Sequence, residues 1–167
     1  DDLLCFGPEL AVAETFEALS RQIDMDPPED IEKYLGCHHE VSRTEHNGEQ
    51  VTEVDFHMSQ YCASACDQFE KETGVLLKSA PTPFVPDISQ DKLDDLCNQP
   101  GEFGEEASHF LMQLLYCARN ARPDIVIAIT RLASRVCKWN ADCDRRLIRL
   151  YEYLKSHTLL HLTGSLS

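Results

Sequence analysis

The sequence predicts an α+β protein that is mostly helical, and three observations support that fold class. An Asn-Gly pair separates two extended segments, three amphipathic helical patterns follow one another toward the end of the chain, and a proline-bearing stretch lies between the two parts. The chain has 167 residues, of which 43% are hydrophobic and 26% are charged. That length and composition fit one domain or two small ones, and they exclude a wholly disordered chain.

The first part of the chain predicts a helix and a β-hairpin. Pro8 suits the first turn of a helix, and apolar residues then recur at helical spacing. These residues are Val12, Ala13, Phe16, Leu19 and Ile23. Residues 32–43 and 50–58 have an extended pattern, and Asn47-Gly48 between them supplies the positive φ angles that a tight hairpin turn needs. We therefore expect a helix that packs on an apolar surface, followed by two antiparallel strands.

The second part predicts a connecting helix, a long loop and a three-helix bundle. Ser59 is a good N-cap for a helix over 60–73, and Gly74 is a good stop. The prolines that follow predict a surface loop up to about residue 101. Helices are then expected over 102–119, from Pro123 and after Asn140, with a short strand over 158–163 that lacks a partner. The expected inward residues of these helices are Cys62, Ala65, Cys66, Phe69, Phe103, Ala107, Phe110, Leu111, Leu114, Leu115, Ile125, Ala128, Ile129, Leu132, Val136, Cys143, Leu147, Leu150, Tyr151 and Leu154.

The formal charge of -14 is unevenly distributed along the chain. Residues 119–155 include nine basic and four acidic residues, a local charge of +5, so the remainder carries -19. A cationic region can contact phosphates although the whole chain would be repelled by them. A solvated helix face is the alternative interpretation of this cluster.

The apolar stretches, the first residues and the cysteines together predict the cellular compartment of the protein. The longest apolar stretches fall far short of the roughly 20 residues that span a bilayer, so we expect no membrane segment. The chain begins with Asp1 rather than Met and has no signal-peptide pattern, which suggests a fragment. Its eight cysteines are too few to force a disulfide scaffold, so we expect reduced thiols and an intracellular protein.

Metal-ligand spacing is poor at the two places where cysteine and histidine gather. On a strand, His38 and His39 beside Cys37 point to opposite faces, and Cys62 and Cys66 share the apolar stripe of a helix. Zinc is therefore disfavoured at both places. A nucleophilic Cys-His pair has no local signature in this sequence either.

Seven short segments, in order and at characteristic intervals, resemble the copia-type long-terminal-repeat retrotransposon reverse transcriptases. They are Asp1-Asp2-Leu3-Leu4, Tyr34-Leu35-Gly36, Met58-Ser59-Gln60-Tyr61, Pro81-Thr82-Pro83, Leu115-Tyr116, Arg122-Pro123-Asp124-Ile125 and Tyr153-Leu154-Lys155. The first is similar to the end of the family's catalytic Tyr-x-Asp-Asp turn. Departures from the family pattern occur at Met112, at Leu132-Ala133-Ser134-Arg135 and at Ser156.

The resemblance implies a C-terminal piece of the polymerase within a Pol polyprotein. The implied divisions are a palm remnant with a primer-grip-like hairpin over 1–58, a linking helix over 59–74, a Pro-containing loop over 75–101, thumb and connection helices over 102–157, and the start of a link to a ribonuclease H domain over 158–167. Fingers and the remaining palm would precede the chain. The implied compartment is the cytoplasm.

The resemblance also implies site residues. Asp1 and Asp2 would be catalytic and would bind Mg²⁺ in the intact parent enzyme, where two such ions join dNTP units to an RNA/DNA template-primer. One turn cannot supply all the carboxylates, so the chain alone is expected to be inactive. The residues expected to bind nucleic acid are Arg122, Arg145, Arg146, Arg149 and Lys155. Arg145 and Arg149 share one side of a helix, which suits consecutive phosphates.

Two alternatives stay open. The arginines of the last helix can instead form a solvated face that pairs with Asp142 or Glu152. The chain as a whole can be a non-catalytic nucleic-acid-binding module or a helical protein-interaction module derived from the polymerase.

Overall fold

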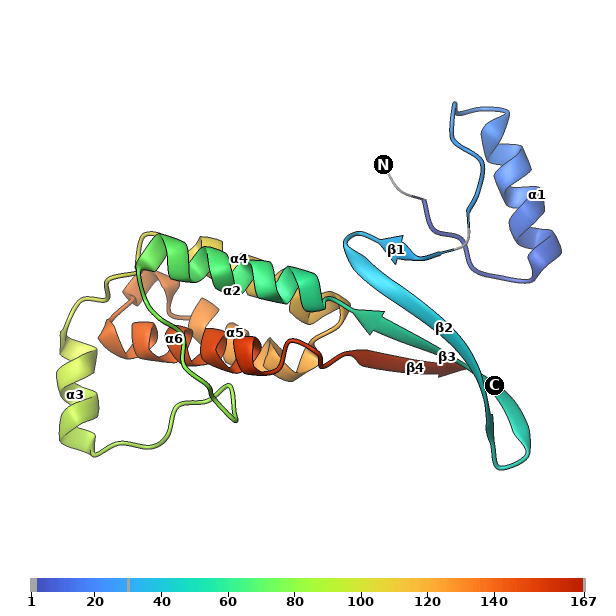
Figure 1. Cartoon of the computed structure of the whole chain (residues 1–167). Helices are drawn as coiled ribbons and strands as arrows, with labels where there is room; N and C mark the ends of the chain where they lie inside the picture. The colour runs from blue at the N-terminus through green and yellow to red at the C-terminus, as the bar shows by residue number, and fades with distance from the viewer. Residues whose placement is uncertain (1–2, 30, 167) are drawn as a thin grey trace.

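The computed structural model describes residues 3–29 and 31–166 and confirms the α+β class. Within these residues the chain forms six α-helices, two short 3-10 helices and one antiparallel sheet with the strand order β1-β2-β3-β4 (Figure 1). About half of the chain is helical. A helical bundle lies at one end, and the sheet extends away from it (Figure 1).

The predicted hairpin is confirmed. Strands β2 (Cys37–His46) and β3 (Glu49–His57) pair antiparallel across a two-residue turn. Asn47 and Gly48 have φ angles of 54° and 85°, so both turn residues take the positive values that this turn type requires. A two-residue strand, β1 (Lys33–Tyr34), pairs with the beginning of β2.

The last strand has a partner, and that corrects the expectation of an unpaired strand over 158–163. Strand β4 (Leu162–Leu166) pairs antiparallel with β3, placing Leu162 opposite Phe56. The partner lies about a hundred residues earlier in the sequence. Local pattern cannot reveal such a pairing, because only the packing of the intervening helices brings the two strands together.

Four helices build the core. They are α2 (Ser59–Thr73), α4 (Ala107–Asn120), α5 (Val126–Ala133) and α6 (Ala141–Ser156). The predicted inward residues are buried, apart from Leu115 and Val136, which are half-buried. Helix α2 is part of this core rather than a simple link, since the Phe69 ring stacks on Tyr151 of α6 with their centroids 4.1 Å apart.

The region between α2 and α4 includes a helix that the sequence pattern did not predict. Helix α3 (Gln90–Asn98) lies against α6, within the stretch predicted as loop. Its half-buried Leu93 and Leu96 are three residues apart, so they share one face. The prolines that suggested a loop, Pro86 and Pro100, lie outside the helix on either side.

Two other helix boundaries differ from prediction. Residues 102–106 form turns before α4 begins, since the Asp144 carboxylate accepts hydrogen bonds from the backbone N–H groups of Glu102 and Phe103 at 2.6 and 3.2 Å. The helix predicted from Pro123 starts as a 3-10 turn, Pro123–Ile125, and α5 ends at Ala133, before a second 3-10 turn, Val136–Lys138. The Asn140 N-cap of α6 is confirmed, because its side chain accepts from the Cys143 N–H.

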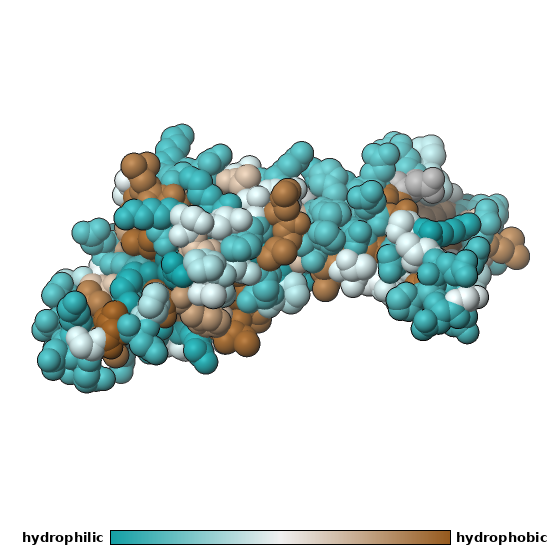
Figure 2. All heavy atoms as spheres, turned by 60° about the horizontal axis from the view of Figure 1, so that its bottom comes forward, coloured by the Kyte–Doolittle hydropathy of each residue, from teal (hydrophilic) through white to brown (hydrophobic). Residues whose placement is uncertain are grey.

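The predicted first helix exists, but its apolar stripe is not covered. Helix α1 (Glu9–Ser20) has no buried residue, and Leu10 is 72% exposed. It stands apart from the bundle in Figure 1. The face of the molecule in Figure 2 shows apolar side chains in separate groups over both the bundle and this N-terminal part. Within the described residues, no helix has both the length and the apolar character to cross a membrane.

Candidate nucleic-acid interface

The predicted site residues have different positions and roles in the structure. Asp1 and Asp2, the predicted catalytic and metal-binding pair, lie outside the described residues. The predicted nucleic-acid contacts Arg145, Arg146 and Arg149 lie on α6, and Lys155 lies in its last turn. Arg122 precedes the 3-10 turn that leads into α5.

Arg122, a predicted phosphate contact, is buried and bonded within the fold. Its side chain is 1% exposed. The guanidinium donates from Nε and Nη2 to the two carboxylate oxygens of Asp124, at 2.9 and 2.8 Å, and from Nη1 to the His157 carbonyl at 2.7 Å. The Tyr153 hydroxyl donates to the same carboxylate at 2.9 Å. This network joins the start of α5 to the end of α6. The Arg122 guanidinium donates its hydrogen bonds to groups of the same chain.

The Arg122 contact also sets the protonation of Asp124. Burial raises the pKa of this carboxyl, but the hydrogen bonds and positive charge of Arg122 outweigh burial, so the pKa lies below its ordinary value. Asp124 is therefore ionised at neutral pH, and the pair is a bidentate, charge-assisted bond.

Asp142 lies at the centre of the remaining basic residues. Its side chain is fully buried in the first turn of α6. It accepts from Arg145 Nη2 at 2.9 Å and from Arg146 Nε at 2.6 Å, and Arg135 Nη1 lies 3.5 Å away. The expected alternative, that these arginines pair with Asp142, is therefore observed. Three guanidinium groups share one carboxylate, which leaves an excess of positive charge.

Arg149 and Lys155 are also engaged within the fold. Arg149 Nε donates to the Thr82 carbonyl at 2.9 Å, which holds the segment around Thr82 against α6. Lys155 Nζ donates to Glu70 of α2 at 2.7 Å. The side chain of Arg149 is 17% exposed and that of Lys155 is 40% exposed, so Lys155 is the more accessible of the two.

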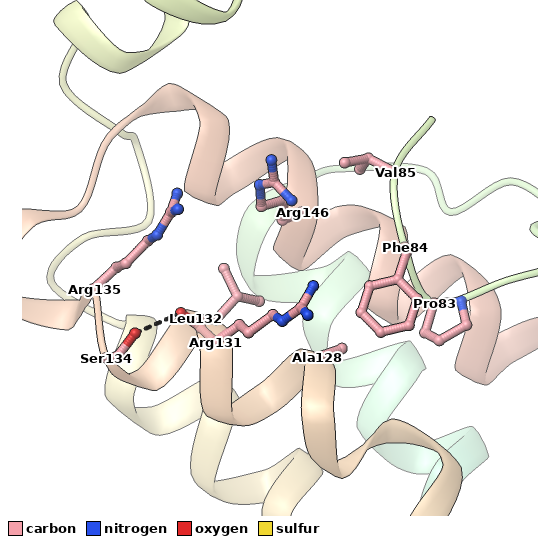
Figure 3. Close-up of a pocket in the computed structure, with 9 residues that line it drawn as sticks. All are labelled: Pro83, Phe84, Val85, Ala128, Arg131, Leu132, Ser134, Arg135 and Arg146. Atoms are coloured by element: carbon pink, nitrogen blue, oxygen red, sulfur yellow. Dashed lines mark hydrogen bonds between the residues drawn. The ribbon is translucent and has the colours of Figure 1, made fainter. Parts of the chain in front are cut away.

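A cavity of about 330 Å³ lies beside this cluster, between α5, α6 and the proline-bearing segment (Figure 3). Pro83, Phe84 and Val85 form one side, and Ala128 and Leu132 form part of the other. The cationic side chains that line it are Arg131, Arg135 and Arg146. Arg131 lies over the Phe84 ring, 5.6 Å from its centroid.

Arg131, Arg135 and Phe84 belong to this site although the sequence pattern did not assign them to it. The spacing of the two arginines was the available signal, because residues four apart share one helix face where the helix continues. The sequence around Phe84 held no such signal, since an aromatic residue among prolines has no periodic pattern. Figure 3 shows the Phe84 ring close to the Arg131 side chain, with Arg146 above them.

The side chains that line this cavity are of types that bind anions. Guanidinium groups bind phosphate through paired N–H donors, and an exposed aromatic ring offers a stacking face for a base or sugar. Phe84 is 41% exposed, and the side chain of Arg135 is 49% exposed, so both are accessible from solvent. Within the described residues lining the cavity no carboxylate is present. The lining therefore combines positive charge with an aromatic face.

The buried carboxylate predicts a pH dependence of stability. Burial raises the pKa of Asp142, but hydrogen bonds from Arg146 and Arg145 outweigh it and place the pKa below its ordinary value. The stabilisation is present above the pKa of the unfolded chain and is lost as pH falls through the lower folded pKa. In urea unfolding, the parent should lose stability as the pH is lowered below about 4, and Asp142→Asn should lose less over the same pH range. Asp87→Asn, at an exposed loop position, should keep the parent's dependence; identical profiles for both variants would contradict the role of Asp142.

Comparison of the chain with protein-family models, with curated proteins and with solved structures finds no match.

Proposed function

We propose that this chain is the C-terminal palm, thumb and connection part of a copia-type RNA-directed DNA polymerase, where it binds the RNA/DNA template-primer. The observation that carries the proposal is the ordered series of seven sequence segments. A single Asp-Asp or Arg-Pro-Asp occurs by chance in many proteins, but a series in fixed order does not.

Contacts between these segments support the proposal. Arg122 and Asp124 of one segment bond to each other, and Asp124 also bonds with Tyr153 of another segment. The Tyr116 hydroxyl donates to the Leu35 carbonyl, which joins two further segments. Segments that lie far apart in the chain therefore meet in the fold. Such contacts are expected if the segments together hold one architecture in place.

The contacts of two more segments fit the same pattern. The Tyr61 and Tyr116 rings lie with centroids 5.2 Å apart, and the Tyr61 hydroxyl donates to the Gln113 carbonyl at 3.2 Å. The Thr82 carbonyl, in the Pro-Thr-Pro segment, accepts from Arg149. Six of the seven segments therefore take part in contacts that hold the fold together, and the seventh is the one that begins at Asp1.

The β2 edge of the sheet is largely uncovered, and in the proposed parent enzyme strands of the remaining palm would pair there. Of the described residues, only the two-residue strand β1 pairs with the outer edge of β2. An uncovered edge of this length is a place where further strands pair. Helix α1, whose apolar stripe is not buried, lies in the same N-terminal part. Both features favour an upstream partner such as the remaining palm and fingers.

The catalytic step belongs to the proposed parent enzyme. Mg²⁺ there would activate the primer hydroxyl and stabilise the leaving pyrophosphate. Asp1 and Asp2 would hold it together with an aspartate from the upstream palm, and a ribonuclease H domain would follow the chain. The role proposed for the described residues is to bind and orient the template-primer.

Primer extension tests the polymerase assignment. The chain alone should extend no primer on an RNA template with Mg²⁺ and dNTPs, and a longer reading frame that includes the upstream palm should extend it. Replacing Asp1 and Asp2 by Asn in that longer protein should abolish extension, while Asp87→Asn should not. A longer protein with intact metal aspartates and no activity would overturn the assignment.

Salt-dependent binding tests the basic surface. The chain should bind an RNA–DNA duplex at low salt, and the double variant Arg131→Ala/Arg135→Ala should lower the slope of log affinity against log salt by about 0.9 for each phosphate that the variant no longer neutralises. Fluorescence anisotropy over a salt series measures this slope. These two arginines are preferred over Arg145 and Arg149, whose replacement would also release the segment around Thr82.

A matched control has the same net charge as the Arg131→Ala/Arg135→Ala variant. The variant Arg21→Ala/Arg119→Ala removes two positive charges at exposed positions that do not line the cavity. It should retain most of the slope. Equal losses in the two double variants would mean that net charge, rather than this surface, governs binding.

A non-catalytic nucleic-acid-binding module is the second candidate. The observation that favours it is that the cavity and its arginines are formed wholly by residues 83–146, without Asp1 or Asp2. If this candidate is right, the chain should bind the duplex in the same way, but the longer protein should not extend a primer.

A further inference from the structure

One face of the sheet gathers imidazoles and carboxylates from β2, from β3 and from the residue just before β4. The register pairs Glu40 with Asp55 across β2 and β3, and Asp55 with Thr163 across β3 and β4. Directly paired residues of antiparallel strands share a face, and so do residues two apart on an extended strand. His57 and His161, each two residues away from a member of this row, therefore lie on the same face.

The donor atoms on this face are close to one another. One ligand atom each of Asp55, His57 and His161 lie within 4.8 Å of one another. His161 Nε2 is 3.6 Å from Asp55 Oδ1, and His57 Nε2 is 3.7 Å from Glu40 Oε2. Zinc bonds of roughly 2.0–2.2 Å place tetrahedral donors about 3.4 Å apart. Small side-chain rotations would therefore close the cluster around one ion.

Two further observations point to a ligand. The Nε2 atom of His57 is buried and has no hydrogen-bond partner within the described part of the chain. Buried polar atoms are normally paired, so this atom is suited to accept a metal ion. The Thr163 hydroxyl donates to the Asp55 carboxylate and orients it. Hydrogen bonds of this kind position metal ligands in known sites.

We propose that Asp55, His57 and His161 bind Zn²⁺, with Glu40 as the fourth ligand. Imidazole nitrogen with carboxylate oxygen is a donor set that suits Zn²⁺, whereas Mg²⁺ prefers oxygen ligands alone. The proposal is independent of the polymerase assignment, because none of these residues belongs to the seven segments or lines the basic cavity.

The site would act as a structural link. His57 ends β3, immediately before the helical bundle, and His161 lies just before β4, after the bundle. An ion bound to both would close a loop of about a hundred residues that includes every core helix. The ligands meet only in the folded chain, so an ion that binds them stabilises the folded chain over the unfolded one.

Competition for Zn²⁺ with a chromophoric chelator tests the site. The full chain is used in a Cys97→Ser/Cys137→Ser background, since these exposed thiols would also bind zinc. One equivalent should bind to this chain and to its His46→Gln variant, where an exposed hairpin histidine is replaced. His57→Gln and His161→Gln should lose that binding, and Thr163→Val should weaken it by about 10- to 100-fold.

Histidine-detected NMR gives a second measurement on the chain without histidine substitutions. One equivalent of Zn²⁺ should shift the ring signals of His57 and His161 and leave those of His46 and His109 in place, and Mg²⁺ should shift none of them. Equal Zn²⁺ binding by all variants, or shifts centred on other histidines, would overturn the proposal. Loss of primer extension or of duplex binding would not bear on it.

Discussion

Replacing Arg122 by Met should lower the free energy of unfolding by about 3 kcal/mol, because the change leaves a paired charge without its partner. Met retains much of the side-chain volume, so the loss reports the guanidinium rather than a cavity. Asp124 would keep only the Tyr153 hydroxyl as a side-chain donor, and the His157 carbonyl would lose the Arg122 bond. The link between α5 and α6 would therefore weaken at that end. Urea unfolding at neutral pH measures the change.

Two variants separate charge from geometry at this position. Arg122→Lys keeps the positive charge but cannot form the two parallel bonds to Asp124, so its stability should fall between that of the parent and that of Arg122→Met. Arg119→Met removes an exposed arginine three residues earlier and should change stability by less than about 0.5 kcal/mol. If Arg122→Met were as stable as the parent but did not bind the duplex, Arg122 would be a phosphate contact after all.

Replacing Phe69 by Ala should lower the free energy of unfolding by about 3 to 5 kcal/mol, the range for a large aromatic residue in a packed core. Phe69 is 0% exposed and lies where α2 meets the other helices. Its ring stacks on Tyr151 and meets the edges of Phe103 and Phe110, with centroids 5.8 and 4.9 Å away. Thermal or urea unfolding followed by circular dichroism measures the loss.

This substitution also tests whether α2 belongs to the bundle. If α2 were only a linking helix, the bundle of α4, α5 and α6 would unfold at nearly the same denaturant concentration in Phe69→Ala as in the parent chain. Phe6→Ala makes the same substitution at a side chain that is 74% exposed, and should be nearly neutral. A small effect at Phe69, similar to that at Phe6, would mean that α2 contributes little to the core.

The local elements of this protein follow from its sequence. The Asn47-Gly48 turn, the Asn140 N-cap and the apolar stripes of the core helices each depend on residues a few positions apart. The sequence also places His38 and His39 on opposite faces of a strand, because side chains alternate along it. Their positions in the structure agree: His38 pairs across the strands with His57, while the His39 ring packs edge-on against Phe56.

The functional surfaces required the tertiary structure. The sequence pattern grouped Arg122 with the other arginines, and only the packing of Asp124 and His157 around it shows that its donors are used within the fold. In the same way, the cavity exists only because the segment around Phe84 lies beside α5. A basic residue has the same sequence signature whether it faces a phosphate, a buried carboxylate or water.

The sequence by itself therefore determined the α+β class, the hairpin turn and the helices that form the core. Tertiary structure alone decided that β4 pairs with β3 and that His161 lies beside Asp55 and His57. The physical reason is the range of the interactions. Helix and turn formation depend on neighbours within a few residues, whereas these contacts join residues up to about a hundred positions apart, which meet only after the helices between them have packed.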